Sequence, residues 1–323
     1  MIYPETHWQT ATPASQGVDP GKLAEALRFV ESMAGPDGIK QALVIRNGYL
    51  IWQNRDIDNR HIIWSCTKSF LSTCLGLLWD DGKCTPQTLA RDYLPAMAAD
   101  YPAVTLEHLA TFTSGYEHAP DNPYQPAKPM YPLGTALHYS RQSDTLAYVL
   151  TMIAREPLAE LFQRRIAGPI GMALEWKNAG QINGLTINGG AGMPESGVYT
   201  TAREMARFGW LYSNQGKWNG QQLISRRYIE YACRPRVSSS VPPYEPNGWY
   251  KILPGSYGLN WWVKGVIWPH APTGTFAAQG NLNNICLIVP EWKMVIVRFG
   301  MDNVVENERY DEMFRILSDG LHR

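Results

Sequence analysis

The stretch IIWSCTKSFLSTCLGLLW, residues 62–79, is a long apolar run in which Lys68 is the only charged residue. Asp80-Asp81-Gly82 follows it, and a glycine just beyond an apolar run is typical of a helix C-terminus. The pattern predicts a buried helix with Gly82 near its C-terminal cap. An ammonium group inside such a helix is costly unless it is paired or neutral. Lys68 therefore requires a partner or a chemical role.

Ser65 is the candidate partner, because it lies three residues before Lys68 and shares its face of the predicted helix. Ser65 would also lie in the first turn, where unsatisfied backbone N–H groups favour a developing oxyanion. Burial and the helix N-terminus should both lower the pKa of Lys68, so that a neutral amine can accept the Ser65 proton. The alternative is a lysine whose amine reaches solvent at the helix start.

Two other segments contain candidate site residues, on weaker grounds than Ser65 and Lys68. Tyr139, in HYSRQSD at 138–144, is either a proton relay beside the Ser-Lys pair or a half-buried aromatic with a wet hydroxyl. In AAQGNLNN, 277–284, Gly280 either lets a ligand approach the backbone or marks a bulge or turn. The simplest interpretation of Asp80, Asp81 and Asp144 is cap and solvent-facing charges.

Strand patterns lie near both ends of the chain and helical patterns in the middle, which predicts an α+β fold. An antiparallel sheet would be built from both termini, flanked by the terminal helices and interrupted by a helical insertion. The lobes would be a sheet lobe, 1–64 and 250–323, and a mainly helical lobe, 65–249, with the site in the cleft between them. The expected helices are 20–34, 202–213, 225–233 and 305–321. The expected strands are a hairpin at 41–53 around Asn47-Gly48 and the runs 258–265, 284–290 and 293–300.

The charge balance excludes several classes of partner. Lys+Arg and Asp+Glu each total 29, so no basic excess indicates nucleic acid or an anionic membrane surface. No uninterrupted run of 18 or more apolar residues, the minimum for a membrane span, occurs, because Lys68 and hydroxyl residues interrupt the stretch 62–79. We therefore expect a small-molecule substrate, no nucleic acid, no membrane, and a monomer or homodimer.

The cysteines and histidines indicate no metal and no cofactor. The five cysteines are odd in number and match no zinc spacing, and the seven histidines form no metal-binding motif. Free, mostly buried thiols fit a reducing compartment. The first 17 residues lack a basic region followed by an apolar one, so a cytoplasmic location is expected.

In their order along the chain, these motifs resemble those of the serine β-lactamase and penicillin-binding-protein superfamily, in the branch of class C β-lactamases, family VIII carboxylesterases and 6-aminohexanoate-dimer hydrolases. Other segments are similar to that family too: WQTATPASQGVD (8–19), TLEHLATFTSGYE (105–117), ESGVYTTAREMARFGWLYSNQGKWNGQQLIS (195–225) and YGLNWW (257–262). The resemblance covers nearly the whole chain and implies a β-lactamase/transpeptidase-like fold.

The resemblance also implies roles for individual residues. Ser65 matches the acylated nucleophile and Lys68 its activating base. Tyr139 matches the tyrosine of the Tyr-x-Asn motif, and Gly280 the glycine of the Lys/His-Thr-Gly motif. The oxyanion hole would consist of the backbone N–H groups of Ser65 and Asn281.

Two departures from the family pattern bear on the substrate. Arg141 replaces the asparagine of Tyr-x-Asn, and Ala278 and Gln279 replace Lys/His-Thr. In β-lactam-binding relatives those positions contact the substrate, so the changes argue against an efficient β-lactamase. Gln279, Gly280 and Arg141 are the candidate substrate-binding residues, although Arg141 is equally well explained as the partner of a structural acid.

The sequence therefore predicts a metal-independent serine hydrolase that cleaves a small ester or amide through an acyl-enzyme on Ser65. Esters need less protonation of the leaving group than amides, which favours an esterase. Two alternatives stay open: a non-catalytic binding or sensor protein on the same fold, and an acyltransferase that uses the same residues.

Overall fold

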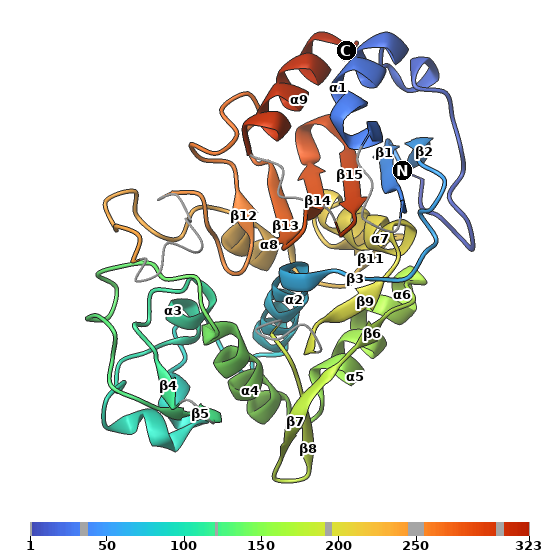
Figure 1. The fold of residues 1–323 in the computed structure, drawn as a ribbon. Helices are drawn as coiled ribbons and strands as arrows, with labels where there is room; N and C mark the ends of the chain where they lie inside the picture. The colour runs from blue at the N-terminus through green and yellow to red at the C-terminus, as the bar shows by residue number, and fades with distance from the viewer. Residues whose placement is uncertain are drawn as a thin grey trace.

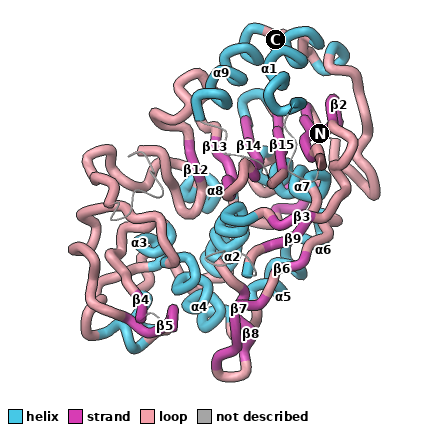
Figure 2. Tube along the Cα trace, in the orientation of Figure 1, coloured by secondary structure: helices cyan, strands magenta, loops and turns pink. Residues whose placement is uncertain are grey.

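The computed structural model describes residues 2–32, 38–119, 122–190, 196–244, 255–301 and 307–322. A six-stranded antiparallel sheet forms the upper half of the molecule in Figures 1 and 2. The strand order β12-β13-β14-β15-β1-β2 joins both ends of the chain, so the prediction of a sheet from both termini is confirmed. Its strands are β1 (Gln41–Arg46), β2 (Tyr49–Gln53), β12 (Trp262–Val263), β13 (Phe276–Gly280), β14 (Asn284–Val289) and β15 (Met294–Phe299).

Helices cover both faces of this sheet. All residues of β14 and β15 are buried, as expected for strands with two covered faces. The terminal helices α1 (Pro20–Ser32) and α9 (Asn307–Asp319) pack together on one face, at the top of Figure 1. Helix α7 (Ala202–Ser213) packs against β14 and β15 on the other. The predicted helical lobe thus supplies a layer of the sheet sandwich, and the division into lobes stays a prediction.

The second part of the molecule is mainly helical and lies below α7 in Figure 1. Its central helix α2 (Thr67–Asp80) and helix α4 (Gln142–Ala154) are buried along almost their whole lengths. The same hydrophobic cluster includes sheet residues such as Leu43 and Val297 and helix residues such as Phe70 and Leu150, so one core connects the two parts. The other helices here are α3 (Leu106–Ala110), α5 (Leu158–Phe162), α6 (Gly168–Ile170) and α8 (Arg226–Ala232).

Short strand pairs connect the helices. One small sheet has the order β3-β9-β6, and three further pairs are two-stranded. These strands are β3 (His61–Ile62), β4 (His118–Ala119), β5 (Asn122–Pro126), β6 (Glu175–Trp176), β7 (Asn178–Ile182), β8 (Leu185–Asn188), β9 (Val198–Thr200), β10 (Lys217–Trp218) and β11 (Gln221–Gln222). The described residues also form short helical turns: η1 (Ala14–Gln16), η2 (Trp64–Cys66), η3 (Ala90–Asp92), η4 (Pro95–Ala98), the π-helical η5 (Gln163–Ala167) and η7 (Pro290–Trp292).

Most of the predicted elements lie where expected, and one is much shorter. Helices α1, α7, α8 and α9 match their predicted ranges within a few residues, and residues 33–34 and 305–306 lie outside the described part. The expected strand 258–265 is wrong in length, because only Trp262–Val263 joins the sheet. Asn260 instead takes a φ of 55° and donates its backbone N–H to Ala110 O, which turns the chain away from the sheet.

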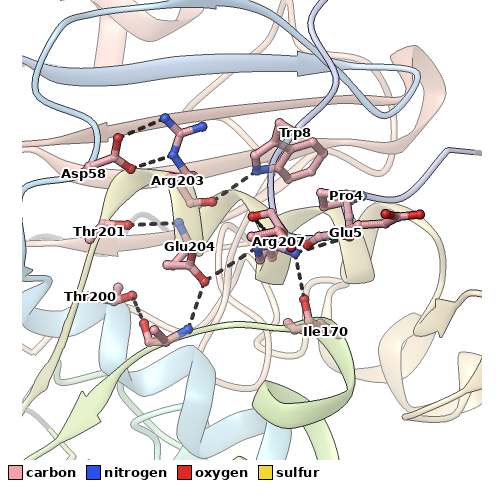
Figure 3. A network of polar contacts seen from close by, with 12 residues as sticks. Pro4, Glu5, Trp8, Asp58, Ile170, Thr200, Thr201, Arg203, Glu204 and Arg207 are labelled. Carbon is pink, nitrogen blue, oxygen red and sulfur yellow. Dashed lines mark hydrogen bonds and ion pairs between the residues drawn. The ribbon is translucent and has the colours of Figure 1, made fainter.

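A buried arginine ties the N-terminal segment to α7 (Figure 3). Arg207 is 2% exposed and its guanidinium donates to backbone carbonyls of two segments. The acceptors are Pro4 O (3.3 Å), Glu5 O (2.8 Å), Thr6 O (2.9 Å) and Ile170 O (3.1 Å). One buried charged group thereby connects the N-terminal segment, α6 and α7.

Candidate active site

Ser65 and Lys68 lie in hydrogen-bond contact. The predicted single helix 62–79 is in fact β3, the turn η2 and then α2, which begins at Thr67. Ser65 is therefore in the turn that precedes the helix, where Trp64 takes a left-handed φ of 47°. Lys68, in the first turn of α2, is 3% exposed and its Nζ donates to Ser65 Oγ at 2.9 Å. The lysine does not reach solvent.

Burial sets the protonation of this amine. Desolvation lowers the pKa of Lys68 from 10.5 to about 8, against the opposing effect of Asp144 and Cys66. Roughly a tenth of the lysines are then neutral at pH 7, far more than for a solvated lysine. The Ser65 hydroxyl consequently has a base within proton-transfer distance.

Asp144 is buried, so its interpretation as a solvent-facing charge was wrong. Its side chain is 4% exposed in the first turn of α4. One carboxylate oxygen accepts the backbone N–H of Gly190 at 2.9 Å, and the other pairs with Arg141 Nε at 3.2 Å. Gly190 is 46 residues away in sequence, and a contact of that kind leaves no local signal. Asp80 and Asp81 are exposed, as expected.

Arg141 therefore has a structural acid as its partner. Its side chain is 35% exposed and forms an i,i+3 ion pair with Asp144. This ion pair is the contact that the second interpretation of Arg141 expects, and a substrate-binding role of Arg141 stays a prediction. The pairing reduces the charge with which the guanidinium could hold a substrate carboxylate.

Tyr139 lies beside the amine, in the loop that precedes α4. The Lys68 Nζ atom is 5.0 Å from the centroid of the Tyr139 ring. Phe112 packs against this ring at a centroid distance of 4.7 Å, and Trp262 at 6.1 Å. The aromatic contacts hold the phenol in place, so the structure brings Ser65, Lys68 and Tyr139 together.

Gly280 brings the end of β13 against the nucleophile turn. A Cβ at this position would lie 2.3 Å from Ile63 O and 3.0 Å from Ser65 N, which no side chain tolerates. The glycine thus allows a backbone-to-backbone approach. Asn281 follows directly in the chain, and an oxyanion hole made from the N–H groups of Ser65 and Asn281 stays a prediction.

The neighbouring positions on β13 are uncharged. Ala278 is fully buried in the core, and Gln279 is half-buried. The Gln279 Oε1 atom is buried without a hydrogen-bond partner among the described residues, so it is available as an acceptor.

The described residues contain no group of three or more His, Cys, Asp and Glu side chains that could hold a metal ion. All five cysteines are buried and free. No helix in the described part of the chain has the length and apolar character needed to cross a membrane.

Comparisons with known proteins show the family and the fold. A family model described as Beta-lactamase matches residues 41–317. A 6-aminohexanoate-dimer hydrolase of Paenarthrobacter ureafaciens is 22% identical over 291 residues, which cover 79% of this chain and 72% of that protein.

Solved structures share the fold. A Bacillus anthracis protein provisionally named a 6-aminohexanoate-dimer hydrolase aligns with a TM-score of 0.69 at 22% identity, over 97% of this chain and 88% of its own. A penicillin-binding-protein homologue from Caulobacter crescentus gives 0.69 at 15% identity, over 94% and 99%. EstCE1, described as a hydrolase with promiscuous acyltransferase activity, gives 0.67 at 14% identity, over 92% and 98%.

Proposed function

This chain belongs to the Beta-lactamase family, and on that premise we propose that it hydrolyses a small amide or ester through an acyl-enzyme on Ser65. The chain is a hydrolase of this family. The serine mechanism is supported above all by the 2.9 Å contact between Lys68 Nζ and Ser65 Oγ. A binding protein on the same fold would not need a buried amine with a lowered pKa beside a serine hydroxyl.

In acylation, Ser65 Oγ attacks the substrate carbonyl carbon while Lys68 Nζ accepts the hydroxyl proton. The carbonyl oxygen gains negative charge, and the N–H groups of Ser65 and Asn281 stabilise it. The resulting ammonium is buried, and the Asp144 carboxylate opposes the cost of its charge.

The tetrahedral intermediate then breaks down. The proton passes from Lys68 through the Tyr139 phenol to the leaving nitrogen or oxygen, and the bond from the carbonyl carbon to that atom breaks. A water molecule then attacks the carbonyl carbon of the acyl-enzyme while Lys68 takes its proton. The bond from this carbon to Ser65 Oγ breaks, Lys68 returns the proton to Ser65 Oγ, and the carboxylic acid leaves. Every step uses groups of this chain and no metal.

The substrate class follows from what lines the site. Ala278, Gln279 and the paired Arg141 provide no strong cationic clamp for a carboxylate, which supports linear amides or esters over penicillins as substrates. Two of the similar proteins carry the name of a hydrolase of the 6-aminohexanoate dimer, whose halves an amide joins. Amides are therefore included beside esters.

The test compares hydrolysis of a p-nitrophenyl ester, a small linear amide and a penicillin by the wild type, Ser65→Ala and Ser69→Ala. Ser69 is the matched control, since its hydroxyl lies one turn further along the chain and donates to Asn260 O at 3.0 Å. We expect Ser65→Ala to lose at least about 10³-fold in kcat, and Ser69→Ala to stay close to the wild type. Retained turnover in Ser65→Ala would contradict the nucleophile, and a preference for the penicillin would contradict the substrate class.

A further inference from the structure

The turn between β13 and β14 has an unusual backbone. It consists of residues 281–283, between the paired residues Gly280 and Asn284. Leu282 has a φ of 57° and Asn283 a φ of 63°, so two consecutive non-glycine residues are left-handed. That conformation is disfavoured for leucine and persists only where the surroundings impose it. The first residue of this turn, Asn281, is the second oxyanion donor in the proposed function.

Arg298 on β15 holds the two left-handed residues. Its side chain is 2% exposed, and Nη1 donates to Leu282 O at 3.1 Å and to Asn283 O at 3.2 Å. The guanidinium lies directly against Gly300, where a Cβ would come within 2.6 Å of Nη2. A planar, permanently charged donor in such a restricted space fixes both carbonyls in one direction.

Asn284 holds the other end of the turn. Its Nδ2 donates to Asn281 O at 2.7 Å and to Gly300 O at 3.1 Å, and its Oδ1 accepts the backbone N–H of Gly300 at 3.3 Å. The thiol of Cys66, the residue after the nucleophile, donates to Asn284 O at 3.4 Å. The peptides on both sides of the turn are therefore tied to β15 and to the nucleophile turn.

We propose that Arg298 is a positioning residue for the reaction: together with Asn284 it holds the turn 281–283 so that the Asn281 N–H stays directed at the substrate carbonyl oxygen. This inference rests on the proposed function. A preorganised donor needs no rearrangement when the oxyanion forms, so loosening the turn lowers the rate of the chemical step rather than substrate binding.

Arg207 is the matched control for Arg298. Both are 2% exposed and both donate to backbone carbonyls. Arg207 holds the N-terminal segment and Ile170, none of which belongs to the site (Figure 3). Arg207 also forms an ion pair with Glu204 at 3.6 Å. Arg207→Met and Arg298→Met each remove a guanidinium that is 2% exposed, so a loss of folding, expected in both, is separated from a loss of positioning, expected only in Arg298→Met.

The experiment measures kcat and KM of the wild type and both variants with an ester and with its thionoester, in which sulfur replaces the carbonyl oxygen. Sulfur is larger and accepts hydrogen bonds poorly, so the ester-to-thionoester ratio of kcat/KM reports the oxyanion hole and not general folding. We expect Arg298→Met to lower kcat for the ester by about 10- to 100-fold, with KM nearly unchanged and the ratio reduced about tenfold or more. Arg207→Met should keep the wild-type ratio.

The possible results separate the positioning role of Arg298 from the Ser65 mechanism. Equal ratios in the wild type, Arg298→Met and Arg207→Met would overturn the positioning role while leaving the Ser65 mechanism intact. Turnover that survives Ser65→Ala would overturn the proposed function and this inference with it. If Arg298→Met does not fold, Arg298→Lys replaces it: a lysine keeps one donor group for the two carbonyls, so an intermediate ratio supports the role and an unchanged ratio contradicts it.

Discussion

At the scale of single residues, the burial of Lys68 connects chemistry with stability. The amine is enclosed in the first turn of α2, and Asp144 is the carboxylate that favours its charged form. Desolvation and this carboxylate act in opposite directions on the pKa of Lys68, and desolvation has the larger effect. The resulting pKa of about 8 lies close to the pH at which a general base is most effective.

The pH dependence of kcat/KM should report this pKa. Because the neutral amine is the base, we expect kcat/KM to rise about tenfold per pH unit below an apparent pKa near 8 and then to level off. Asp144→Asn removes the carboxylate that raises the pKa and leaves Arg141 without its counter-charge, so the rising limb should move to lower pH. Asp81→Asn, on an exposed carboxylate, is the control. If the rising limb of kcat/KM stays at the same pH in Asp144→Asn, the Asp144 carboxylate does not raise the pKa of Lys68.

The same burial should make Lys68 destabilising at neutral pH. The pKa of Lys68 is near 10.5 in the unfolded chain and about 8 in the folded chain. Between pH 8 and pH 10.5 the unfolded state therefore binds more protons than the folded state. Stability should therefore rise with pH across that window. We expect Lys68→Met to raise the free energy of unfolding at pH 7 by about 1–3 kcal/mol. The gain should shrink toward pH 10.5.

Denaturant titrations at pH 7 and pH 10 measure this difference. Lys83→Met, on an exposed lysine that follows α2, is the control and should change stability little at either pH. A Lys68→Met protein less stable than the wild type at pH 7 would show that the amine contributes more by its contacts than it costs by its burial.

At the scale of elements, the site depends on the contact between the end of β13 and the turn η2. Gly280 permits it, because any larger residue would meet Ile63 O. We expect Gly280→Ala to separate Asn281 from Ser65, to lower kcat/KM at least about 100-fold, and to lower the free energy of unfolding by about 1–3 kcal/mol. Gly21→Ala is the control, since a Cβ there would meet only the Asp19 side chain, at 3.2 Å. Full activity in Gly280→Ala would contradict this geometry.

Local pattern was sufficient for much of the fold. Helices α7 and α9 and strands β14 and β15 follow from apolar periodicity, and the hairpin β1–β2 follows from Asn47-Gly48. The contact between Ser65 and Lys68 was predictable, because the two residues are three positions apart and Lys68 is the only charged residue in 62–79. The pattern did not predict that the strand expected at 258–265 begins only at Trp262, because the bond from Asn260 N to Ala110 O joins distant segments.

Tertiary contacts also explain the unpredicted parts of the site. Asp144 is buried by the loop at Gly190, and Arg298 meets the turn 281–283 only because β14 and β15 pair. The left-handed φ of Trp64, in the turn that holds Ser65 just before α2, has no counterpart in residue preferences, since tryptophan rarely adopts it. A charged residue in an otherwise apolar strand, as Arg298 is in MVIVRF, is the one sequence signal that could have indicated the Arg298 contact.

At the scale of the whole molecule, one hydrophobic cluster runs from the inner face of the sheet through α2 into the helical part. Such a continuous core opposes the independent unfolding of either part. We expect far-UV circular dichroism, tryptophan fluorescence and esterase activity to be lost in one coincident transition during denaturant titration. An earlier loss of helix signal, with the sheet still folded, would instead show two separate units.

The proposed reaction depends on a covalent bond to Ser65 that Lys68 makes possible, and labelling with a fluorophosphonate followed by peptide mapping measures that bond directly. We expect a single adduct, on Ser65, that forms at least about 100-fold more slowly in Lys68→Met than in the wild type. An adduct on another residue, no adduct on the folded wild type, or an unchanged rate in Lys68→Met would contradict it.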